Sequence, residues 1–165
     1  MKNFNYKGFT LIELLAVVAI IGLLATIVVL ALGNTLKKAR DTKRKSDLAQ
    51  MGRFILASSC YLPDLGAGDY DLKDLIPELT AKYPQYAQFA GALPKDPKTG
   101  SETATNYRYQ ATADGRCAMY ANLENENEVI TLNSITAPTA GAGTGVLKAT
   151  NPGPNGTFIY YQIGK

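Results

Sequence analysis

The sequence predicts an α+β fold in which one long N-terminal helix packs against a small antiparallel β-sheet. An uncharged apolar stretch over residues 14–32 continues, without proline, into a polar segment rich in helix-forming residues. Runs of strand-forming residues follow only beyond residue 105. Leu48, Met51 and Ile55 recur at helical spacing, so the helix carries an apolar stripe that a sheet can cover.

The N-terminal region divides into a leader and an apolar helix half. Residues 1–8 form a leader that carries two lysines and no acidic residue. Residues 9–32 are the apolar half of the helix, and their charge-free stretch would be about 28 Å long at about 1.5 Å per residue. Because the hydrocarbon core of a bilayer is about 30 Å thick, we expect this half to cross a membrane once.

The second, amphipathic half of the helix is predicted over residues 33–59 and is basic at its start. Six lysine and arginine residues lie between Lys37 and Lys45, whereas residues 54–165 are net acidic. We interpret this basic collar, defined as residues 37–45, as a solvated helix face beside a membrane. A specific anion or DNA site is the alternative interpretation.

A globular head is predicted over residues 60–165. Residues 70–80 are predicted to form a short helix. Residues 106–123 are predicted to form two strands joined at Asp114-Gly115, a pair suited to a tight turn because glycine tolerates positive φ. The remaining predictions are strands at 128–135 and 157–163 and an exposed loop of low order at 137–156.

The composition excludes several kinds of catalytic and metal site. The chain has no histidine, which removes the commonest general base and the commonest metal ligand. Its two cysteines, Cys60 and Cys117, cannot make a structural zinc site by themselves. They are predicted either to form a disulfide or to remain two buried free thiols. We expect no enzyme activity, no metal site and no cofactor.

A single acidic residue, Glu13, lies inside the apolar half of the helix. An ionised carboxylate in hydrocarbon costs several kcal/mol unless it is neutralised or paired. The apolar segment offers no basic residue as a partner. The partner must therefore come from another molecule or from the bilayer surface.

The sequence KGFTLIELLAVVAIIGLLA, residues 7–25, resembles the processing site and helix of type IV pilin and type II secretion pseudopilin precursors. The resemblance implies a pilin fold and cleavage by a prepilin peptidase between Gly8 and Phe9. It also implies that the peptidase methylates the new N-terminus at Phe9. By the same resemblance, Glu13 pairs with the Phe9 amine of a neighbouring subunit during filament assembly.

The function implied by the resemblance is that of a structural subunit of a type IV pilus-like filament. Its partners would be further copies of the chain, membrane lipid, and an assembly platform with a cytoplasmic ATPase motor. The precursor would cross the cytoplasmic membrane once with its head outside, and the mature form would reside in an extracellular or periplasmic filament. The charge rule applied to the basic collar would instead place the head in the cytoplasm, and the resemblance outweighs it.

Other functions compete with a pilin. A type II secretion pseudopilin is the first alternative. The resemblance implies a calcium site of mainly acidic residues in the C-terminal loop of major pseudopilins, and no Asp or Glu follows Glu128, so a pilin is favoured. A DNA-binding minor pilin would use the basic collar, but we expect no nucleic-acid partner because the head is net acidic. A cleaved secretion signal ending near Gly33, or a plain membrane anchor, would leave Glu13 unexplained.

Overall fold

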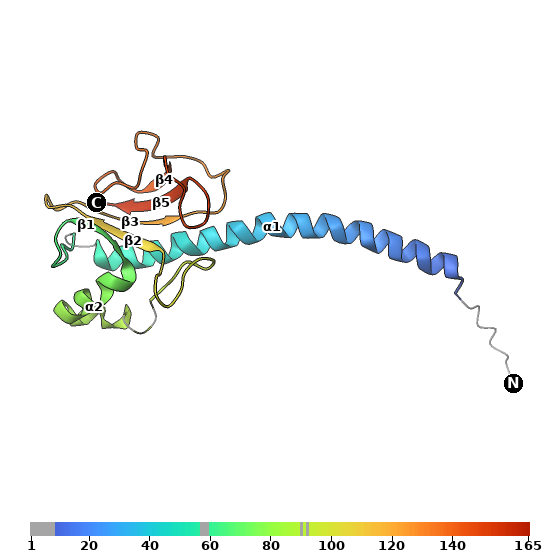
Figure 1. The fold of residues 1–165 in the computed structure, drawn as a ribbon, viewed down its shortest axis with the longest axis horizontal. Coiled ribbons are helices and arrows are strands. Elements are labelled where there is room, and N and C mark those ends of the chain that lie inside the picture. Colours follow the sequence, from blue (N-terminus) through green and yellow to red (C-terminus); the bar gives the residue numbers. More distant parts are fainter. Residues whose placement is uncertain (1–8, 57–59, 90, 92) are drawn as a thin grey trace. The chain divides into compact units, whose positions relative to one another are not determined.

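The computed structural model describes residues 9–56, 60–89, 91 and 93–165 (Figure 1). The leader predicted at residues 1–8 lies outside this part of the chain. The chain divides into two compact units between Leu36 and Lys37. The predicted α+β class, a long apolar N-terminal helix followed by a small antiparallel sheet, is confirmed.

Helix α1 spans Leu11–Ile55 and is 45 residues long. Among the described residues it is the one helix long and apolar enough to cross a membrane. The helix was predicted to continue to about Ser59, but it ends at Ile55, and residues 57–59 lie outside the described part of the chain. The side chain of Lys165 donates a hydrogen bond to the Leu56 carbonyl just beyond this end. This contact satisfies a carbonyl that a helix terminus leaves without an intrahelical partner.

The head contains a five-stranded antiparallel sheet. Its strands are β1 (Gly68–Asp71), β2 (Tyr107–Ala111), β3 (Cys117–Asn122), β4 (Gly145–Lys148) and β5 (Ile159–Gly164). Their order in the sheet is β1-β2-β3-β5-β4, so β5 lies between β3 and β4. The strands predicted within 106–123 and 157–163 are confirmed. The β2–β3 hairpin turns through Gly115, whose φ of 81° is readily adopted only by glycine.

One face of the sheet packs on the second half of α1 (Figure 1). Alternate side chains of β2 and β3 face the helix, and Tyr107, Tyr109 and Met119 are fully buried there. They pack with Leu48 and Met51 of α1 in one continuous core. The apolar stripe predicted on the helix is therefore its core-facing side, and each such side chain contributes about 1.5–3 kcal/mol when fully buried.

A second helix, α2 (Leu72–Lys82), completes this core. The Asp71 side chain caps it by accepting a 2.9 Å hydrogen bond from the Lys73 backbone N–H. The helix buries four apolar residues in the core, namely Leu72, Leu75, Ile76 and Leu79. The short helix predicted at 70–80 is thus confirmed, with both of its ends two residues further along the chain. A 3-10 helix, η1 (Pro84–Phe89), follows it.

The sequence-based predictions for residues 128–156 are partly wrong. Residues 128–135 form no strand, because the Thr131 and Leu132 N–H groups both donate to one carbonyl, that of Val146, and no ladder develops. The segment 137–156, predicted as an exposed loop, contains β4 and buries Leu147 completely. Its glycine-rich part is held by two buried or half-buried glutamines of the sheet. Gln110 accepts from the Ala140 N–H and Gln162 from the Thr139 N–H.

Candidate assembly site

The residues singled out for assembly, Phe9 and Glu13, lie at the N-terminal end of α1. Thr10 precedes the helix, and its backbone N–H and Oγ1 donate to Glu13 Oε2 at 2.9 and 2.7 Å. The Glu13 N–H is directed back at Thr10 Oγ1, at 3.4 Å. This reciprocal arrangement is a capping box, which satisfies donors that the first turn of a helix leaves unpaired. Glu13 therefore has a local structural role that the sequence analysis did not assign.

The capping box leaves part of the Glu13 carboxylate for another partner. Both hydrogen bonds from Thr10 end on Oε2. No hydrogen bond to Oε1 is found from the residues that the structure describes, and Glu13 is exposed. A cation from a second molecule can therefore approach Oε1 without breaking the cap. Gly8, the other half of the predicted cleavage site, lies outside the described residues.

The surface around this site is apolar and uncovered. From Phe9 to Val28, each large hydrophobic side chain that the structure describes is at least 46% exposed. A soluble monomer rarely exposes a contiguous apolar surface of this extent. This half of α1 thus requires lipid or other helices as its surroundings.

The basic collar is not a freely solvated face. Arg44 is fully buried, and its guanidinium contacts the carboxylates of Asp41, Asp96 and Glu124 at 2.7 to 2.9 Å. Arg40 makes a bidentate pair with Glu124, with both distances 2.7 Å. The interpretation of these residues as a solvated face is wrong, because Asp96 and Glu124 come from loops distant in sequence that fold onto the helix.

The outer lysines of the basic collar are paired as well. Lys43 contacts Asp47 one turn along the helix, at 3.1 Å, and Lys45 contacts Glu128 at 2.6 Å. Hydrogen bonds from Arg40 lower the pKa of Glu124 to about 2 against the opposing effect of desolvation. Four of the six cations of the collar thus neutralise acids of the same chain, which weakens the main argument for a DNA site.

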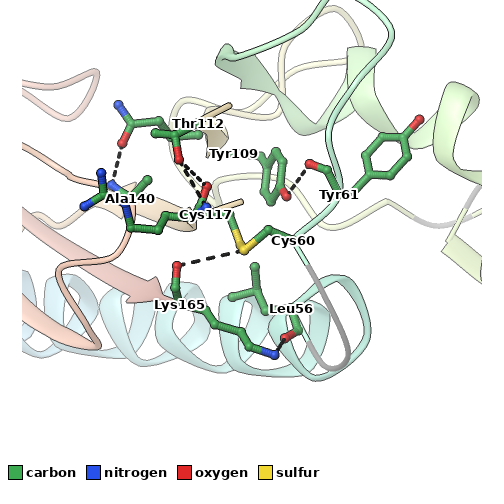
Figure 2. Close-up of a disulfide and its surroundings, with 10 residues drawn as sticks. Leu56, Cys60, Tyr61, Tyr109, Thr112, Cys117, Ala140 and Lys165 are labelled. Carbon is green, nitrogen blue, oxygen red and sulfur yellow. Dashed lines mark hydrogen bonds between the residues drawn. A yellow bond between two sulfur atoms is a disulfide. The ribbon is translucent and has the colours of Figure 1, made fainter. Parts of the chain in front are cut away.

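A disulfide joins Cys60, after the end of α1, to Cys117 at the start of β3 (Figure 2). Their Cα atoms are 5.6 Å apart, and 57 residues separate them in sequence. Lys165 lies beside the bridge, where it exchanges two backbone hydrogen bonds of 2.8 Å with Cys117. The end of the helix, the central sheet and residue 165 are therefore tied together at one place.

Two comparisons with known proteins bear on this arrangement. Residues 3–29 match a family model described as the prokaryotic N-terminal methylation motif. The chain is also similar to the type II secretion system core protein G of Dickeya chrysanthemi, with 34% identity over 115 residues. That alignment covers 67% of this chain and 70% of the relative. No solved structure matches the chain.

Proposed function

We propose that this chain, which belongs to the family of type IV pilin and type II secretion pseudopilin precursors, is the repeating subunit of a secretion pseudopilus. The observation that carries this proposal is the extent of the similarity to core protein G. The alignment spans 115 residues, whereas the methylation motif covers only residues 3–29, so the likeness includes the head. Members of the family are structural subunits, and no enzyme activity is proposed for this one.

The proposal differs from the preference for a pilus stated on sequence grounds. That preference rested on the lack of acidic residues after Glu128. Similarity across the head is the more direct argument, because heads and not the N-terminal motif distinguish members of the family. A type IV pilus subunit is therefore the second candidate, and the two share the steps proposed next.

Assembly would begin with cleavage between Gly8 and Phe9 and methylation of Phe9. The exposed apolar half of α1 would remain in the cytoplasmic membrane, with the head outside, until a platform driven by a cytoplasmic ATPase extracts it. Lipid and helix neighbours are both apolar, so burial alone gives little preference for the filament. The pairing of Glu13 with the Phe9 amine of a neighbour would supply the selectivity, since both charges are costly in lipid.

Intact mass and N-terminal sequencing of the membrane or filament fraction test the processing step. We expect a chain that begins at Phe9 and carries one additional methyl group. An uncleaved Met1 would indicate a plain anchor, and a start at Asn34 would indicate an ordinary secretion signal. Either result would remove the role assigned to Glu13.

Deletion of the gene in the native host separates the two kinds of filament. We expect loss of secreted enzymes from the medium, restored by the wild-type chain, with surface pili and twitching motility unchanged. Loss of pili with normal secretion would favour the pilus subunit instead. The processing result is the same for both, so the two experiments address different parts of the proposal.

A further inference from the structure

The centre of the polar contact between α1 and the head is one buried cation, Arg44. Its guanidinium is fully buried and contacts three carboxylates, all of them nearly buried. Asp96 binds it through two parallel hydrogen bonds, Nε to Oδ2 at 2.7 Å and Nη2 to Oδ1 at 2.8 Å. Asp41 and Glu124 both contact Nη1, at 2.7 and 2.9 Å. We call these four residues the Arg44 cage.

Two carboxylates of the Arg44 cage, those of Asp41 and Asp96, also hold a segment of backbone. Asp41 accepts the N–H groups of Glu124 and Asn125, at 2.9 and 2.8 Å. Asp96 accepts the N–H groups of Lys98 and Thr99, both at 2.9 Å. The cage therefore organises two loops, one before β2 and one after β3, around a single charge on α1.

The C-terminal loop is attached to the same cage through Asn155. Its side-chain Nδ2 donates to Asp96 Oδ2 at 3.0 Å and to the Asn122 carbonyl at 2.8 Å. Its backbone N–H donates to Asn122 Oδ1 at 2.8 Å. The loop between β4 and β5 is thus positioned by an amide that contacts a carboxylate already bound by Arg44.

The residues of this loop do not fit the calcium site that the resemblance to major pseudopilins implies. Calcium takes roughly six to eight oxygen ligands and favours carboxylates. No Asp or Glu follows Glu128 in this chain, so the loop supplies no carboxylate. Within the described residues no group of three or more acidic, cysteine or histidine side chains is arranged to hold a metal ion. The three carboxylates that do converge have a guanidinium between them.

Two buried neutral oxygens of described residues lack a hydrogen-bond donor, Asn155 Oδ1 and Thr99 Oγ1. Both residues contact Asp96 through other atoms. They do not make a calcium site on the donor set present, because the adjacent carboxylate is committed to Arg44. They are nevertheless the buried oxygens beside Asp96 that are not committed to another partner among the described residues.

We propose that Arg44 is the internal cation that holds the C-terminal loop and the two neighbouring loops onto α1, so that this head folds without calcium. A fixed guanidinium does here what a bound divalent ion does elsewhere, which is to collect carboxylates from separate segments at one point. The inference concerns the head and does not depend on which filament the chain builds. It follows that the stability of the folded head does not depend on the calcium concentration.

Thermal unfolding of the full-length chain in detergent, followed by circular dichroism, tests this proposal. We expect the same thermal midpoint in millimolar calcium chloride and in excess EGTA, because an ion that does not bind the native state does not change its unfolding temperature. A midpoint several degrees higher in calcium would overturn the proposal and point to the loop of Asn155. Neither result depends on whether the chain forms a filament.

Variants of Arg44 test the positive part of the proposal. Arg44→Met leaves the buried carboxylates of Asp41 and Asp96 without the cation that contacts them, while Glu124 keeps Arg40. We expect the thermal midpoint of this variant to fall by about 10 °C or more. The thermal midpoint of Arg44→Lys should lie between those of Arg44→Met and wild type, because an ammonium group keeps the charge but cannot reproduce the bidentate pair with Asp96. Arg53→Met, at an exposed arginine of the same helix, is the matched control and should leave the midpoint unchanged.

If Arg44→Met does not fold, Asp96→Asn gives the same information with a smaller perturbation. It should lower the midpoint equally in calcium and in EGTA. An Arg44 or Asp96 variant as stable as Arg53→Met would contradict the role of the cage.

Discussion

The hydroxyl of Tyr107 on β2 donates a 2.9 Å hydrogen bond to Asp47 Oδ2 on α1, across the interface between helix and sheet. Tyr107 is fully buried and Asp47 nearly so. Desolvation, together with the charge of Asp47, raises the pKa of Tyr107, so the phenol remains a donor at any physiological pH. The contact is therefore a polar link between α1 and β2 within their buried interface.

Removal of this donor should destabilise the head. Tyr107→Phe leaves the Asp47 carboxylate with one fewer hydrogen bond in a nearly buried position, and we expect a loss of about 1–3 kcal/mol in the free energy of unfolding. Urea unfolding of the full chain in detergent would measure it. Tyr160→Phe, at a half-buried tyrosine on the same sheet, is the control and should cost less. Equal losses would show that the hydrogen bond to Asp47 contributes no more than the loss of a hydroxyl at a half-buried position.

The Cys60–Cys117 disulfide should contribute a large share of the stability of the head. On the chain-entropy model, closing a loop of this length stabilises the folded state by about 4 kcal/mol. We expect a reductant to lower the thermal midpoint of the wild-type chain. A Cys60→Ala/Cys117→Ala variant should have a lowered thermal midpoint both with and without reductant. A wild-type midpoint that does not respond to full reduction would contradict this expectation.

The charge of Glu13 and its capping role can be separated. Glu13→Gln keeps a side chain that can complete a capping box but removes the charge. We expect this variant to be cleaved before Phe9 yet to be absent from sheared filaments, because the amine of the neighbour loses its partner. Thr10→Val is the matched counterpart, since it removes the capping hydroxyl and keeps the charge, and it should still assemble. The idea fails if Glu13→Gln assembles normally.

The Arg44 cage should make the head sensitive to acid. Burial alone would raise the pKa of Asp96, but hydrogen bonds from Arg44 and from the Thr99 and Lys98 N–H groups hold it well below its usual range. The pKa of Glu124 is lowered to about 2. Carboxyl groups with a lowered folded-state pKa add stability above their unfolded pKa, about 4, and lose it as the pH falls through the folded value.

The thermal midpoint should therefore be flat above about pH 5 and fall between about pH 4 and pH 2. Glu124→Gln should be less stable than wild type at neutral pH and should show a shallower decline in acid. A decline that is equally steep in this variant would assign the acid sensitivity to other carboxylates.

DNA binding by the head is expected to be absent. Four cations of the basic collar, Arg40, Lys43, Arg44 and Lys45, already contact carboxylates of the same chain. Few counterions would be released on contact with phosphates, so a gel-shift assay at about 50 mM salt should show no complex. Retention that disappears in Lys37→Glu/Lys38→Glu would restore the DNA-uptake hypothesis.

Local patterns in the sequence predicted much of the fold. Leu48, Met51 and Ile55 identified the buried face of α1 because helical periodicity is a property of neighbouring residues. The Asp114-Gly115 turn placed the β2–β3 hairpin for the same reason. The N-terminal motif carried the family, which the comparison with core protein G supports.

Long-range contacts could not be predicted in this way. Arg44 looks like any solvated lysine or arginine of the collar until Asp96 and Glu124 arrive from 52 and 80 residues later in the chain. β4 was missed because its four residues, GVLK, are stabilised by pairing with β5 and have no alternation of their own. The capping box at Thr10 is by contrast a local feature, which the Thr-x-x-Glu spacing of Thr10 and Glu13 predicts.

The position of β5 in the sheet has a consequence for the order of folding. Among the described strands, β4 pairs only with β5, and β3 has β5 as its second neighbour. As the chain is made from its N-terminus, β1, β2 and β3 can pair early, but the rest of the sheet cannot form until residues 159–164 are available. Until then the free edge of β3 could pair with a strand of another molecule. Formation of β5 is therefore also the step that covers the free edge of β3.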